Sequence, residues 1–206
     1  MGRYVWERLG MKLSLNRADL LEALQELILE LRARNVRGEI RIVGGAALSL
    51  SYFERDVTQG IDVMNVRGGD NEAVAEVARF VASKLDLNDN WLNFEVTQTD
   101  ALPALGQEVE WHTIYSSPET TIQVASADAL LAMKLRANRP GRDVNDIRAL
   151  LALVGITDVA SAEALYESFY PGDVLPDRAI RILDNLFAEV DPQPITAPPA
   201  PTFDSD

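Results

Sequence analysis

The residues from Arg41 to Met64 constrain the fold more than any other stretch, because they combine a strand, a double glycine, a helix and a second strand. Ile40 to Val43 is a β-branched run and predicts the first strand. Gly44 and Gly45 follow directly, and glycine adopts backbone conformations that other residues avoid. Residues 46–53 are mostly small or apolar and contain no helix breaker. The double glycine is therefore expected at the N-terminus of a short helix.

This turn is typical of an anion site. Free N–H groups and the helix dipole at a helix N-terminus favour a phosphate. The second strand is expected to begin near Gly60 and carries Asp62 between two apolar residues, Ile61 and Val63. Strand alternation places Asp62 on the opposite face from those neighbours. A carboxylate beside a phosphate site suggests a divalent cation shared with substrate phosphates.

The order strand, Gly-Gly, short helix and Thr58-x-x-Ile61-Asp62 resembles the minimal core of the DNA polymerase β nucleotidyltransferase superfamily. It is most similar to small bacterial proteins near the type IV abortive-infection toxins and the mycobacterial tRNA-modifying toxins. The resemblance covers most of residues 13–190. It implies transfer of a nucleoside monophosphate from a nucleoside triphosphate to RNA, such as tRNA, or to protein, with Mg²⁺. It also implies a cognate antitoxin as partner.

The same resemblance extends to a helix, a basic loop and a second helix that opens with two acids. Leu130 to Leu135 surrounds Lys134, a position that contacts nucleotide phosphates in the family. The implied catalytic residues are Asp62, Lys134 and Asp146, the implied nucleotide-binding residues are Gly44, Gly45, Thr58, Lys134 and Asp143, and the implied metal ligand is Asp62.

Each of these residues also has a purely structural interpretation. The glycines can serve only a tight turn, and Asp62 can pair with a neighbour such as Arg55. Lys134 can be a solvated lysine, and acids at the start of a helix complement its dipole.

Gly60 departs from the family pattern, in which two acids, Asp-x-Asp, bind the metal. Loss of one of two acids is expected to weaken metal binding strongly. The alternative function is therefore a catalytically inactive variant that binds a nucleotide or a partner. On the sequence alone, a Gly60→Asp variant is expected to gain magnesium-dependent transfer.

Composition limits the possible partners. The chain has 206 residues and a net charge of −13, which opposes a general nucleic-acid-binding surface. Basic residues nevertheless cluster at 32–41 and at 134–148. No apolar run is long enough to span a bilayer, and the absence of cysteine excludes disulfides and is compatible with the cytoplasm, the expected location.

The overall expectation is an α/β (α+β) fold with a mixed sheet of about four strands flanked by helices. Residues 13–125 are expected to form the core, 126–190 a helical part packed on it, and 191–206 a disordered, proline-rich, acidic tail. A leucine stripe in the first helix is expected in the core rather than in a dimer. The predicted strands are 40–43, a strand from about 60, 109–115 and 120–124; the predicted helices are 16–34, 46–53, 72–84, 127–138, 143–154, 161–169 and 176–190.

Overall fold

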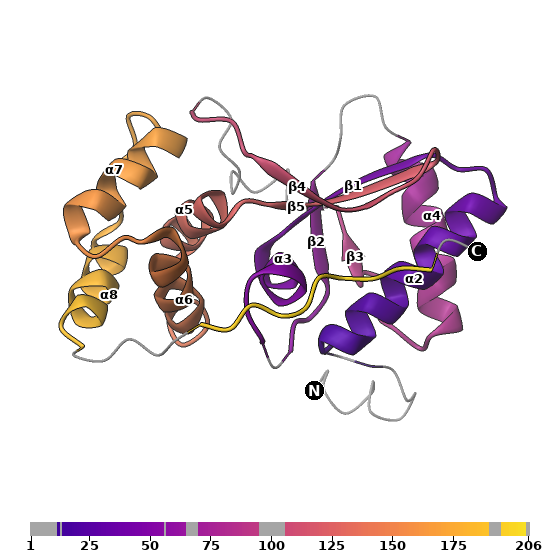
Figure 1. Cartoon of the computed structure of the whole chain (residues 1–206), viewed down its shortest axis with the longest axis horizontal. Helices are drawn as coiled ribbons and strands as arrows, with labels where there is room; N and C mark the ends of the chain where they lie inside the picture. The colour runs from indigo at the N-terminus through magenta and orange to yellow at the C-terminus, as the bar shows by residue number, and fades with distance from the viewer. Residues whose placement is uncertain are drawn as a thin grey trace, which may run out of the picture.

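The computed structural model describes residues 12, 14–55, 57–64, 70–94, 106–189 and 195–204. In this part of the chain, seven helices flank one mixed sheet of five strands (Figure 1). The expected α/β fold is confirmed. The sheet has one strand more than expected, because the dipeptide Leu92–Asn93 pairs with the strand that carries Asp62.

The strands lie in the order β3-β2-β1-β5-β4. The central strand β1 is antiparallel to β2 and parallel to β5, while the outer pairs are parallel for β2–β3 and antiparallel for β4–β5. The strands are β1 (Gly38–Val43), β2 (Ile61–Met64), β3 (Leu92–Asn93), β4 (Trp111–Ser116) and β5 (Thr120–Ala125).

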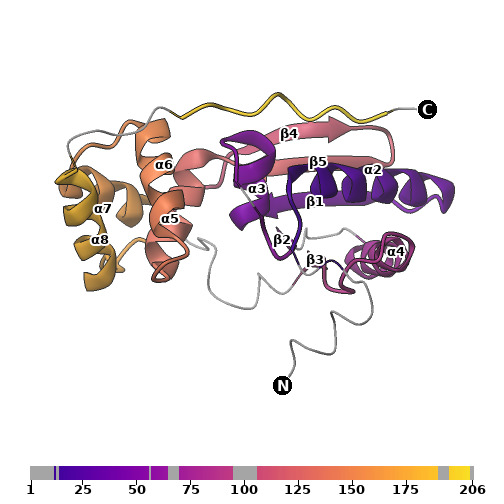
Figure 2. The same cartoon turned by 90° about the horizontal axis from the view of Figure 1, so that it is seen from below.

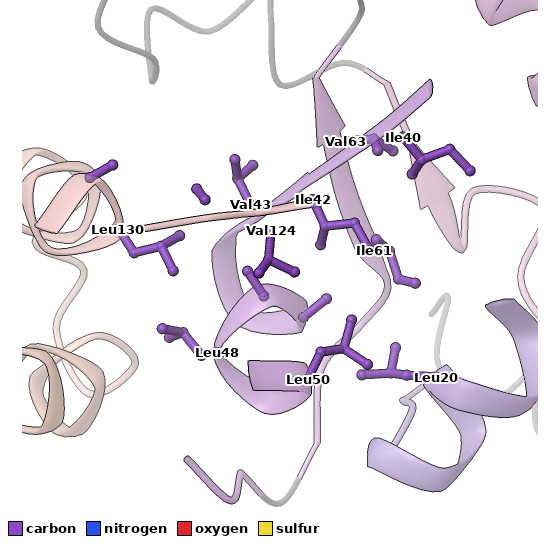
Figure 3. Close-up of a cluster of buried hydrophobic side chains, with 14 of the residues drawn as sticks. Leu20, Ile40, Ile42, Val43, Leu48, Leu50, Ile61, Val63, Val124 and Leu130 are labelled. Carbon is purple, nitrogen blue, oxygen red and sulfur yellow. The ribbon is translucent and has the colours of Figure 1, made fainter. Parts of the chain in front are cut away.

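Alternation along the central strands separates an apolar face from a polar face. Ile42 of β1, Ile61 of β2 and Val124 of β5 are fully buried. Figure 3 shows them facing side chains from two helices, among them Leu20 and Leu48. Burial of each such side chain contributes about 1.5–3 kcal/mol to stability. The opposite face of β2 carries Asp62, as the alternation predicts, and the core therefore fixes where this carboxylate lies.

Two helices at the N-terminal end of the chain flank the sheet, and a third begins directly from β1. The long helix α2 starts with a capping box between Asn16 and Asp19. Its leucines, including Leu24 and Leu27, are fully buried, so the stripe serves the core of the same chain. The helices are α2 (Arg17–Ala33), α3 (Gly44–Ser51) and α4 (Asn71–Lys84).

The remaining helices gather beyond the β4–β5 hairpin, at the other end of the molecule from α2 and α4 (Figure 1). Asn138 and Gly155 end the first two of them in left-handed conformation. Tyr166 donates a hydrogen bond to Asp173 at 2.9 Å, which ties the third helix to the loop that follows it. These helices are α5 (Ala127–Ala137), α6 (Val144–Val154), α7 (Val159–Phe169) and α8 (Asp177–Phe187).

Residues 195–204 form an extended segment, here called the strap, that runs from the helical group back to α2 (Figures 1 and 2). Arg17 Nη2 donates to the Pro199 carbonyl oxygen at 2.6 Å. Farther along α2, the Gln25 side chain donates to the Asp204 carbonyl and accepts from the Asp204 N–H. The strap is therefore held at two points on one helix.

The composition of residues 191–206 predicts a disordered tail, and its described part, the strap, has no helix or strand but makes side-chain contacts. The Phe203 ring packs edge-on against Tyr115 of β4, with ring centroids 5.6 Å apart. Ile195 also packs against the core. One ring, one aliphatic side chain and hydrogen bonds from α2 thus order a segment that is too polar to form a core of its own. Residues 190–194 and 205–206 lie outside the described part.

The sequence contains no predicted membrane span. Correspondingly, no single helix in the described ranges is both long and apolar enough to cross a membrane. Helices α6 and α7 are long and apolar enough for a membrane span only when taken together, and the chain bends by 93° between them.

Candidate functional site

The turn from β1 into α3 has the geometry that the double glycine predicts. Gly44 has a φ of +67°, a left-handed conformation that favours glycine. No side chain caps this end of α3, because the preceding residue is Val43. The N–H groups of the first turn are therefore available to a ligand.

Asp62 lies directly beside this turn. It pairs across the strands with Val43, and a β-carbon at Gly44 would stand 2.9 Å from Asp62 Oδ2. The other carboxylate oxygen accepts a hydrogen bond of 3.3 Å from the Asn93 side chain. The first glycine of the turn and Asp62 are thus brought to one place by the pairing of β1 with β2.

The loop between α3 and β2 adds a cation to the site. The Arg55 guanidinium lies over Gly45, where a β-carbon would overlap it. Arg55 Nε is 3.4 Å from Asp146 Oδ1, so Arg55 pairs with Asp146 in α6. Thr58 lies next to the same glycine, and its hydroxyl donates to the Gly60 carbonyl at 3.1 Å. Thr58 therefore stabilises its own loop as well as lining the site.

Lys134 is buried in an ionic cluster. Its Nζ is 2.7 Å from Asp143 Oδ1 and 2.7 Å from Asp146 Oδ2. Only 6% of the lysine side chain is exposed. An ammonium group has three N–H donors, so one remains for a ligand after both carboxylates are satisfied.

Asp143 is fully buried and accepts hydrogen bonds from two cations. Arg139 donates from its Nε at 3.0 Å and from its backbone N–H at 2.9 Å. Burial raises the pKa of the Asp143 carboxyl, but hydrogen bonds from Arg139 and Lys134 outweigh it and bring the pKa to about 2. Asp143 is therefore ionised and holds both cations in place.

These groups surround a cleft of about 1000 Å³ where α3, β2 and α5 come together. Four basic side chains and one carboxylate line it among the described residues. Its lining consists of Ser14, Gly44, Gly45, Arg55, Val57, Thr58, Gln59, Gly60, Asp62, Asn88, Lys134, Arg139 and Arg142.

The cleft collects most of the residues singled out from the sequence. Both glycines of the turn, Thr58, Asp62 and Lys134 line it. Asp143 and Asp146 do not line it but lie buried behind Lys134 and position its Nζ.

Three arginines that line the cleft are not among the site residues predicted from the sequence. Arg139 and Arg142 belong to the basic cluster at 134–148, and that cluster was the available signal. Arg55 stood out only as a possible partner of Asp62, whereas it pairs with Asp146.

The residues do not fit a metal held by two acids. Asp62 is the one carboxylate in the described lining, and no three Asp, Glu, His or Cys side chains converge as metal ligands in the described ranges. A β-carbon at Gly60 would stand 2.8 Å from the Trp91 carbonyl oxygen. A side chain at position 60 would thus collide with the backbone, and the expectation that an acid there completes the pair loses its structural basis.

Comparisons of the chain with protein-family models, with curated proteins and with solved structures found no match. The functional inference therefore rests on the residues that line the cleft.

Proposed function

We propose that this chain binds a nucleoside triphosphate in the cleft. One observation supports this most strongly: an uncapped glycine turn, one carboxylate and four basic side chains from distant parts of the sequence face the same space. The proposal follows the nucleotidyltransferase resemblance for the location of the nucleotide. For the activity, it favours the alternative of a catalytically inactive protein that binds a nucleotide, because Asp62 is the one acid in the described lining.

The phosphates would lie between the first turn of α3 and the arginines. The turn offers backbone N–H groups, and Arg55 lies over Gly45. Arg139 and Arg142 line the same cleft from the loop before α6, and arginine binds phosphate oxygens through paired N–H donors. The free N–H of Lys134 completes the set. A volume of about 1000 Å³ leaves space for a ribose and a base beside the phosphates.

The experiment is to measure binding of ATP, GTP, CTP and UTP to the full chain by equilibrium dialysis, in buffers with and without Mg²⁺. Arg142→Gln removes an exposed cleft cation and is expected to weaken binding by about tenfold, the usual effect of losing a charge-assisted hydrogen bond. Arg148→Gln is the matched control, because Arg148 of α6 pairs with Glu189, which follows α8, and does not line the cleft. Absence of binding for all four nucleotides in both buffers contradicts the proposal.

Transfer of a nucleoside monophosphate to tRNA or to a protein is the second candidate function. The place of Asp62 beside Gly44 favours it. A toxin role with a cognate antitoxin, in the cytoplasm, belongs to this candidate and has the resemblance as its support. Incubation of the chain with labelled nucleotides, Mg²⁺ and tRNA or total protein tests it, and incorporation that Asp62→Asn abolishes would support transfer.

A further inference from the structure

Basic side chains predominate in the lining of the cleft, whereas acidic side chains predominate in the whole chain. The chain carries a net charge of −13, yet basic side chains outnumber acidic ones by four to one in the described lining. Arg139 and Arg142 are exposed, and Arg139 is paired with Asp143, so Arg142 is the exposed guanidinium that can turn toward a ligand. The cleft is therefore built for a compact anion.

The structure leaves little room for a second free carboxylate in the cleft. Asp143 and Asp146 are buried and already hold Lys134, Arg55 and Arg139. At position 60, the Trp91 carbonyl occupies the space that a side chain would need. A divalent cation in the cleft would thus meet one carboxylate and several positive charges, which repel it.

We propose that the cleft binds the triphosphate as the metal-free anion, with arginine side chains in the place of the divalent cation. This inference rests on the proposed nucleotide binding. A triphosphate without Mg²⁺ carries more negative charge than its magnesium complex, so the basic lining attracts it more strongly. Arg55, which lies over the glycine turn, and Arg142, which is exposed, are the principal phosphate ligands.

ATP is the probe, titrated by calorimetry into the full chain in EDTA and in excess MgCl₂ at equal ionic strength. We expect binding to be at least about fivefold tighter in EDTA, because the free anion gains more from the four cations. If binding requires Mg²⁺ or tightens with it, the inference is overturned while nucleotide binding stands. If no nucleoside triphosphate binds in either buffer, both proposals fail.

The change in ATP affinity caused by Asp62→Asn distinguishes binding of the free triphosphate from binding of its magnesium complex. A cleft that takes the free anion is expected to bind ATP in EDTA about threefold more tightly after this change, because one repelling charge is removed. The asparagine keeps the size of the side chain and an oxygen that can accept from Asn93. Weaker binding of ATP in EDTA by Asp62→Asn would overturn the inference. Arg148→Gln again serves as the control and is expected to leave both titrations unchanged.

Discussion

The backbone around Gly60 leaves no space for a β-carbon. The Trp91 carbonyl oxygen that would collide with it also accepts the Ile61 N–H at 2.6 Å, so the pairing of β2 with β3 fixes its position. The Trp91 side chain is itself buried and donates from Nε1 to the Ala78 carbonyl at 2.8 Å. Glycine at position 60 is thus required by the sheet, independently of any chemistry at Asp62.

Gly60→Asp is therefore expected to lower the free energy of unfolding by about 1–3 kcal/mol, the usual effect of overpacking. It is not expected to produce magnesium-dependent transfer. Urea unfolding at pH 7 measures the first effect, and label incorporation measures the second. Gln59→Asp is the control, since it adds the same charge one residue earlier on an exposed side chain. Unchanged stability together with new transfer activity would show that the carboxylate reaches the cleft.

At the scale of elements, local patterns predict most of this fold. Apolar periodicity and capping residues located all seven described helices within a few residues, and four strands followed from β-branched runs. The strand β3 was missed because two residues have no periodicity. The contacts of the strap could not be predicted, because composition measures how much a segment can bury alone, whereas Phe203 and the Asp204 backbone contact side chains on other elements.

Removal of the strap, by ending the chain at Glu189, is expected to destabilise the protein by about 1–2 kcal/mol. The loss reflects hydrogen bonds from Arg17 and Gln25 and the ring contact of Phe203 with Tyr115. In a chain of this size, each kcal/mol lowers Tm by about 2–4 °C. Calorimetry measures the shift, with Glu22→Gln on the exposed side of α2 as a control. An unchanged Tm would mean that the strap contacts contribute no stability.

At the scale of the whole molecule, the cleft and its ionic cluster join the α/β core to the helical part. Arg55 of the core pairs with Asp146 of α6, and Lys134 of α5 lies between that acid and Asp143. The sequence indicated the glycine turn, Asp62 and Lys134 one by one. Their convergence depends on the parallel pairing of β1 with β5, which local patterns do not reveal. The ion pair of Arg55 with Asp146 could not be predicted either, because it also depends on how distant elements pack.

The ionic cluster makes the stability of the molecule depend on pH. The pKa of Asp143 is about 2 in the folded protein and near 3.8 ordinarily, so its contribution is complete above about pH 4 and is lost as the pH falls toward 2. Asp143→Asn is expected to cost about 3–5 kcal/mol at pH 7, because it removes one of the two carboxylates that pair with the buried Lys134 and the carboxylate that pairs with Arg139.

The difference in unfolding free energy between the wild type and Asp143→Asn should therefore narrow as the pH falls from 4 to 2. Urea unfolding at a series of pH values measures it. Asp177→Asn, on an exposed residue of α8, is the control and should follow the wild type. A difference that stays constant down to pH 2 would contradict the role assigned to Asp143.

The strap also sets an order of events during synthesis. Arg17 and Pro199 lie 182 positions apart, so α2 leaves the ribosome long before its partner exists. The sheet and α2 can pack as soon as β5 has emerged, and the helical part follows. The strap is thus the last described segment that can dock, and its closure marks a chain whose preceding elements are already in place.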